Sequence, residues 1–118
     1  MQVVDTLFPD LQPAYRTRVY FGLGDNTQVK IGTTGRKSGR RGGEMHFTEL
    51  CAVPGDRETE DRYHAQYAAE RIGRTEWFWL SDRLLMDLIV KCVQQGRVKS
   101  VETLKGIALG RLRQAAAA

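Results

Sequence analysis

Two segments near the start of the chain alternate between apolar and polar positions. They cover residues 17–23 and 28–33, and residues 24–27 between them are of types that are common in turns. A period of two residues indicates half-buried β-strands, so the pattern predicts a β-hairpin. The residues of its predicted apolar face are Val19, Phe21, Leu23, Val29 and Ile31.

The hairpin determines which side chains share its second face. Because side chains alternate along a strand, pairing the two apolar faces places Tyr20 and Lys30 together on the opposite face. This register requires a connecting loop with an odd number of residues, about three or five. We therefore expect a phenol and an ammonium group on one side of the sheet.

The middle of the chain predicts one more strand, a helix and an aromatic segment. Residues 45–53 suit a third strand, although two polar residues interrupt its alternation. A turn follows, and Asp56 can cap a helix over residues 57–70. The aromatic run at 76–80 forms either an edge strand or a wedge into the core.

Two further helices are predicted towards the C-terminus. Ser81 caps the first, whose apolar stripe comprises Leu84, Leu85, Leu88, Ile89 and Cys92. Ser100 opens the last helix, in which one face carries Leu104, Ile107, Ala108 and Leu112 but neither Arg111 nor Arg113.

Length and element order together indicate the fold class. A chain of 118 residues suits one domain, and its 42% hydrophobic and 27% charged residues are ordinary for a folded protein. The order of elements predicts a mixed α/β (α+β) architecture, with a small three-stranded, mainly antiparallel sheet flanked by helices.

No targeting or redox signal is visible in the sequence. The first residues lack the basic start and apolar stretch of a secretory signal, and no segment is long and apolar enough to span a membrane. Cys51 and Cys92 lie in apolar surroundings without metal-ligand spacing, which favours two reduced, buried thiols. We therefore expect a cytoplasmic protein with no membrane partner.

The positive charge is concentrated in one segment. The net charge is +4, and Arg36, Lys37, Arg40 and Arg41 form a basic run within residues 36–41. Such a run suits contact with the phosphates of a nucleic acid, and its alternative is a solvated charged loop.

Two groups of residues carry candidate chemistry. An ammonium beside a phenol favours the phenolate, so Lys30 would make Tyr20 a better general base. Glu60 and His64 lie four positions apart, which places a carboxylate and an imidazole on one helix face. The alternatives are packing of Tyr20 on the sheet, a solvent-facing Lys30, helix-dipole compensation by Glu60 and a partly buried His64.

The motifs that these residues form resemble those of the GIY-YIG nuclease superfamily. Val19-Tyr20-Phe21 and Lys30-Ile31-Gly32 are similar to its two signature triplets, and an arginine and a helical glutamate follow. Its compact branch, common in phages and mobile elements, shares the Lys-Ile-Gly triplet, the spacing of Glu60 and His64, and a later Glu-Trp-Phe, here residues 76–78. The resemblance covers about residues 17–80.

The resemblance implies a role for each matching residue. Tyr20 would activate the attacking water, and Glu60 would ligate Mg²⁺ or Mn²⁺. Arg40, eight positions beyond the glycine of the second triplet, would stabilise the phosphoryl charge, with Arg41 as the alternative register. Lys30 stands where many relatives carry a second tyrosine. His64 would assist proton transfer, join the metal shell or pack behind the site.

The implied function is a divalent-metal-dependent endonuclease that hydrolyses DNA, with RNA left open, for a phage, plasmid or other mobile element. The alternative is a non-catalytic nucleic-acid-binding or assembly module, favoured by Arg18 in place of the first signature glycine and by the glycine-rich segment around Arg40. Residues 1–16 would be an N-terminal arm, 17–95 the nuclease domain and 96–118 a C-terminal helix packed on or extending it. The apolar stripe of residues 100–112 offers a dimer contact, and a homodimer stays open.

Overall fold

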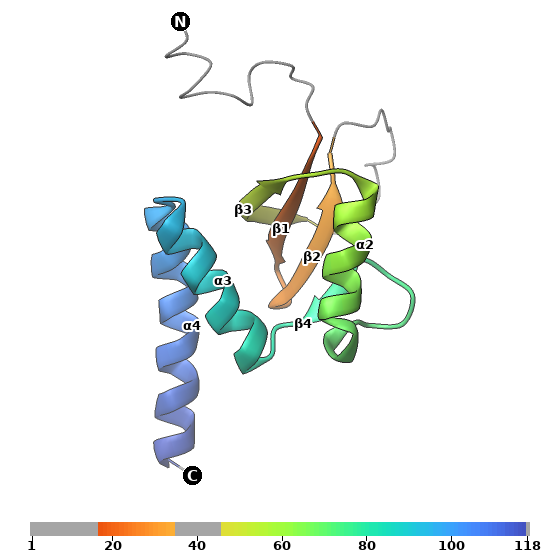
Figure 1. Cartoon of the computed structure of the whole chain (residues 1–118). Helices are drawn as coiled ribbons and strands as arrows, with labels where there is room; N and C mark the ends of the chain where they lie inside the picture. The colour runs from red at the N-terminus through yellow and green to blue at the C-terminus, as the bar shows by residue number, and fades with distance from the viewer. Residues whose placement is uncertain (1–16, 35–45, 118) are drawn as a thin grey trace, which may run out of the picture.

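The computed structural model describes residues 17–34 and 46–117. Figure 1 shows the order of the elements in these residues. They are β1 (Arg18–Gly24), β2 (Gln28–Thr33), β3 (Phe47–Pro54), α2 (Arg57–Gln66), the short 3₁₀ helix η2 (Ala68–Glu70), β4 (Trp77–Trp79), α3 (Asp82–Gln94) and α4 (Val98–Ala117).

The strands form a single antiparallel sheet in the order β3-β1-β2-β4. The mixed α+β class is confirmed, whereas the prediction of three strands is wrong, because the aromatic run forms the edge strand β4. This strand has only three residues. A run that short shows no clear period, so only its pairing with the edge of β2 distinguishes a strand from a core wedge.

The predicted hairpin is confirmed in its register and its loop. Phe21 lies opposite Ile31 and Gly22 lies opposite Lys30, so Tyr20 and Lys30 share one face of the sheet. Asp25, Asn26 and Thr27 connect the strands, which is an odd number of residues. The loop closes because the Thr27 backbone N–H donates to the carbonyl of Gly24 at 3.0 Å.

A β-bulge explains the imperfect alternation of β3. Phe21 pairs with Cys51 but Gly22 pairs with Glu49, so Leu50 is an extra residue in β3. Both Leu50 and Cys51 are buried as a result. Bulges of this kind rotate the strand locally and allow consecutive side chains to enter one core.

The helices α2 and α3 cover one face of the sheet. Figure 1 shows α2 beside β2, α3 towards β3, and α4 packed along α3 on the outside. The core lies between this helical layer and the sheet, and its buried residues come from both. The largest are Phe21, Ile31, Leu50, Tyr67, Phe78, Leu84, Leu88 and Leu104. The opposite face carries Tyr20, Lys30, Phe47 and Trp77.

Helix α2 begins as predicted and ends earlier. The Asp56 carboxylate accepts hydrogen bonds from the backbone N–H groups of Glu58 and Thr59, which confirms the cap. The α-helix stops at Gln66, and η2 completes the predicted span to Glu70. At the junction the Tyr67 hydroxyl donates to Asp87 of α3 at 2.6 Å, so the tertiary contact with α3 holds this change of helix type.

Helix α3 has the cap and the stripe that the sequence predicts. The Ser81 hydroxyl accepts from the backbone N–H of Leu84, and the stripe faces the core. Cys92 in that stripe and Cys51 are both free, buried thiols, as expected. Burial, followed by the neighbouring Cys92, raises the pKa of Cys51 to about 12, so this thiol stays protonated.

Helix α4 differs from its prediction in start and face. It begins at Val98, and the Ser100 hydroxyl donates to the carbonyl of Leu50 at 2.8 Å instead of capping. Leu112 is 65% exposed, whereas Arg111 donates to Asp82 and to the carbonyl of Leu80, so the predicted face is wrong at these two positions. Arg111 lies seven residues, or about two helical turns, beyond the buried Leu104, so it shares that face and its long side chain can reach α3.

Much of the apolar stripe that suggested a dimer contact is used within the chain. Leu104 is fully buried, and Ile107 and Ala108 pack against the core.

In the part of the chain that the structure describes, no helix combines the length and the apolar character that a membrane span requires.

Candidate active site

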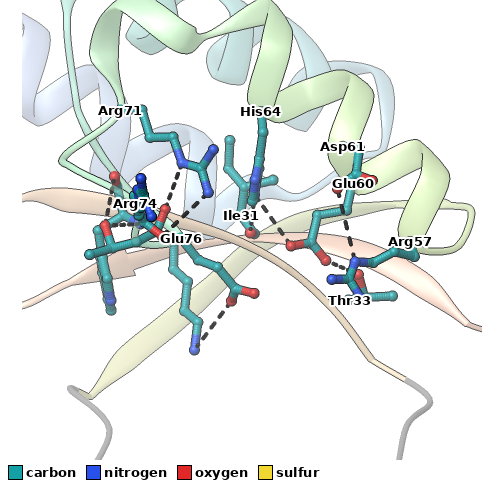
Figure 2. A network of polar contacts seen from close by, with 12 residues as sticks. Ile31, Thr33, Arg57, Glu60, Asp61, His64, Arg71, Arg74 and Glu76 are labelled. Carbon is teal, nitrogen blue, oxygen red and sulfur yellow. Dashed lines mark hydrogen bonds and ion pairs between the residues drawn. The ribbon is translucent and has the colours of Figure 1, made fainter.

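The candidate site lies at the edge of β2 beyond its pairing with β4. Strand β4 pairs with Gln28, Val29 and Lys30, and the next contact is the Ile31 backbone N–H donating to the carbonyl of Glu76 at 3.0 Å. Beyond this point the chain that enters β4 turns away towards Arg74 and Arg71. Figure 2 shows Glu60 and His64 from α2 and Glu76 from the start of β4 gathered at this edge.

Glu60 is a buried carboxylate with two polar neighbours. Its residue is only 5% exposed. The Thr33 hydroxyl donates to Oε1, and His64 Nε2 lies 3.3 Å from Oε2. Because Glu60 and Thr33 come from α2 and β2, this contact joins the helix to the sheet edge. The carboxylate is therefore held in place rather than free to rotate.

His64 is held by the backbone of β2. Its Nε2 lies 3.0 Å from the carbonyl oxygen of Ile31, and its ring packs against Phe78 at 5.1 Å between centroids. A carbonyl oxygen only accepts, so Nε2 must carry the hydrogen. The same N–H faces the Glu60 carboxylate. In this arrangement Nε2 has no lone pair for a metal ion or a proton, and the imidazole orients Glu60.

Glu76 is a site residue that the sequence does not predict, because the aromatic run around it indicates an edge strand or a core wedge and gives its carboxylate no role. Its Oε1 lies 3.9 Å from Lys30 Nζ, and its side chain is 45% exposed. Partial burial, followed by the negative charge of Glu60, raises the pKa of Glu76, while Lys30 and His64 oppose this shift. Glu76 thus stands between the ammonium on one side of the sheet and the carboxylate of α2.

A signal for Glu76 was present in the sequence. Glu76 and Phe78 are two positions apart, so in a strand their side chains leave the same face. Phe78 is fully buried towards α2, and Glu60 lies on α2. An edge strand that includes residue 76 would therefore place Glu76 on the side of Glu60, whereas in the structure Glu76 precedes β4 and its carboxylate also reaches Lys30 and Gly32 on the other side of the sheet.

Gly32 gives the site its close packing. A Cβ atom at Gly32 would lie 2.7 Å from the Tyr20 hydroxyl oxygen and 3.1 Å from Glu76 Oε1. The absence of a side chain therefore lets both oxygens approach the backbone of β2. Tyr20 is also stacked on Phe47, with centroids 5.2 Å apart and planes inclined by 7°.

The structure brings four of the predicted site residues together. Tyr20, Lys30, Glu60 and His64 surround the segment from Lys30 to Thr33, with Glu76 between them. The predicted phosphate-contacting residues Arg36, Lys37, Arg40 and Arg41 lie outside the described residues. The choice between Arg40 and Arg41 therefore stays a prediction.

No protein family, no curated protein and no solved structure matches this chain. The resemblance to GIY-YIG nucleases thus stays a prediction that the motif residues carry.

Among the described residues, the carboxylates of Glu60 and Glu76 are the groups at this edge that could bind a metal ion. Within residues 17–34 and 46–117 there is no group of three or more histidine, cysteine, aspartate or glutamate side chains that could hold a metal ion. A cation here would be bound by Glu60 and Glu76 and completed by water. Mg²⁺ commonly binds in this way, through one or two carboxylates and several waters.

Proposed function

We propose that this chain is a divalent-metal-dependent endonuclease that hydrolyses phosphodiester bonds of DNA. The observation that carries the proposal is that a tyrosine hydroxyl, an ammonium group and two carboxylates gather along Lys30 to Thr33 of β2. These groups come from β1, β2, α2 and the start of β4. Hydrolysis of a phosphodiester needs a proton acceptor, positive charge and a site for a cation, and this set supplies them.

The donor set fits Mg²⁺ or Mn²⁺. Burial and the charge of Glu60 act together to raise the pKa of Glu76, which means that the two carboxylates repel each other. A hard divalent cation relieves this repulsion and prefers carboxylate and water ligands. When bound, such a cation polarises the phosphoryl group and acidifies a bound water.

The chain's own residues have distinct roles in this proposal. Tyr20 would accept the proton of the attacking water, since its hydroxyl lies over Gly32 beside Glu76. Lys30 supplies positive charge and is oriented by Glu76 and by the ring of Phe47, 5.3 Å from its Nζ. His64 is a positioning residue for Glu60. Arg40, outside the described residues, would stabilise the phosphoryl charge.

The test is nicking of supercoiled plasmid by the purified protein with Mg²⁺ or Mn²⁺, beside samples with EDTA. We expect metal-dependent nicking, and a loss of about 100-fold or more in Tyr20→Phe, Glu60→Gln and Glu76→Gln, since each removes a group that acts on the reaction. Glu58→Gln is the matched control. Glu58 lies on the same helix and is exposed, so its variant should retain full activity.

The opposite result has a defined meaning. If the plasmid stays intact under every metal condition while the protein still binds DNA in a salt-sensitive way, the non-catalytic module replaces the nuclease as the proposed function. Arg18 is a sequence feature that favours that module. In the structure it forms an ion pair with Glu49 of β3 at 3.0 Å, a contact that favours neither function.

A further inference from the structure

A layer of aromatic rings lies on the sheet face opposite α2 and α3. Tyr20 stacks on Phe47, and Phe47 meets Trp77 edge-on with centroids 6.4 Å apart. Glycines underlie the rings. A Cβ at Gly22 would lie 2.3 Å from the ring of Phe47, and one at Gly24 would lie 2.8 Å from that of Trp77. These two glycines therefore let both rings lie close against the sheet.

The layer is partly open to solvent and continues into an exposed ring. Tyr20, Phe47 and Trp77 are each partly exposed, and Trp79 is 56% exposed. Trp77 and Trp79 are two positions apart in β4, so both leave the same face of the sheet. They are also the two tryptophans of the chain. The large apolar rings of this face are thus concentrated beside the candidate site, with Tyr20 common to both.

Cations border the aromatic layer. Lys30 Nζ lies 5.3 Å from the centroid of Phe47, and the carboxylate of Glu76, 3.9 Å from this Nζ, offsets its charge, so the excess positive charge lies elsewhere. On the β3 side, Arg18 and Arg97 both bind the carboxylate of Glu49, at 3.0 and 3.2 Å, which leaves an excess of one positive charge there. A partner for this face should therefore combine flat π systems with negative charge.

We propose that this face is a stacking platform for the unpaired nucleobases of a nucleic-acid strand, which it holds next to the candidate active site. Single-stranded nucleic acid combines negative backbone charge with exposed base faces, and aromatic side chains bind such bases by stacking. In a duplex the base faces are stacked on one another, and only base edges are accessible in the grooves. The platform therefore favours unpaired nucleotides over duplex.

The platform deepens the proposed function by naming the substrate class, and it rests on that function only for its link to cleavage.

The first test measures tryptophan fluorescence during titration with a short single-stranded oligodeoxynucleotide and with its duplex, both in EDTA. Because both tryptophans lie in the platform, we expect quenching by the single strand. We expect the duplex to bind about tenfold more weakly.

The second test measures the binding of a labelled single strand by fluorescence anisotropy in matched variants. Trp79→Ala should weaken binding about tenfold, whereas Trp79→Phe, which keeps a ring, should restore most of it. Met86→Ala is the control, because Met86 on α3 is also 56% exposed. Its variant should bind as the unmodified chain does.

Two results would overturn the platform. One is equal affinity for single strand and duplex, and the other is equal binding by Trp79→Ala and Met86→Ala. The nicking assay separates this proposal from the proposed function. If the protein does not nick plasmid but binds the single strand preferentially, only the proposed nuclease function is overturned. If it nicks plasmid but shows no preference for the single strand, only the platform is overturned.

Discussion

At the scale of single residues, Gly32 decides whether the site groups can meet. Its φ angle is negative, so the requirement for glycine comes from space and not from backbone conformation. The atoms that a Cβ would meet are the hydroxyl of Tyr20 and the carboxylate of Glu76, both at the ends of flexible side chains. A substitution can therefore displace the site groups without unfolding the chain.

We expect Gly32→Ala to reduce plasmid nicking by about 100-fold, because displacing reacting groups by about 1 Å has an effect of that size. Its thermal unfolding midpoint should stay close to that of the unmodified chain. Gly106→Ala is the control, since a Cβ there meets nothing within 4 Å and α4 tolerates alanine. Unchanged nicking by Gly32→Ala would show that Tyr20 and Glu76 do not act together.

At the scale of elements, an ion pair joins η2 to the start of α3. Glu70 is buried, and it accepts hydrogen bonds from Arg83 at 2.7 Å and from the Ser81 hydroxyl at 2.6 Å. The guanidinium of Arg83 is the largest cause that lowers the pKa of Glu70 from its ordinary 4.5. Ser81 also caps α3, so one carboxylate orients both elements.

The pH dependence of this contact follows from the lowered pKa. A carboxyl group whose pKa is lower in the folded than in the unfolded chain stabilises the fold above the ordinary pKa of 4.5 and loses this effect as the pH falls through the folded value. Glu70→Gln should therefore lower the urea midpoint at neutral pH, and the difference should shrink in strong acid. Glu58→Gln, at an exposed position, should change the urea midpoint at neutral pH less than Glu70→Gln does. A difference that grows in acid would contradict this assignment.

At the scale of the whole molecule, α4 is part of the core although it lies outside the α3 layer. Leu104 is fully buried, Ser100 binds the backbone of β3, and Arg111 binds the carbonyl before α3. The contacts reach from the start of α4 to its last third. The helix therefore contributes to the stability of the sheet and its site.

We expect Leu104→Ala to lower the free energy of unfolding by about 2–5 kcal/mol, because truncating a buried leucine leaves a cavity. Leu109→Ala, on the same helix at a half-exposed position, should change it by less than about 0.5 kcal/mol. Urea unfolding followed by circular dichroism measures both. Equal effects of the two substitutions would mean that α4 is not packed as described.

The features that could be predicted from the sequence arise from interactions between near neighbours along the chain. Alternation fixed the face shared by Tyr20 and Lys30, and side-chain caps fixed the starts of α2 at Asp56 and α3 at Ser81. Such features depend on the periods of strands and helices and on hydrogen bonds two or three residues away. They hold whatever the rest of the fold does.

The remaining features depend on contacts between groups that are distant in sequence. Three features each require a partner element. They are the pairing of β4 with β2, the extra residue Leu50 in β3, and the orientation of Arg111, rather than Leu112, towards α3. The position of Glu76 beside Lys30 and Glu60 has the same origin, since a sheet edge, a helix and a strand start meet there. The pattern of one sequence cannot predict such contacts, because they contribute free energy only when the elements are packed together.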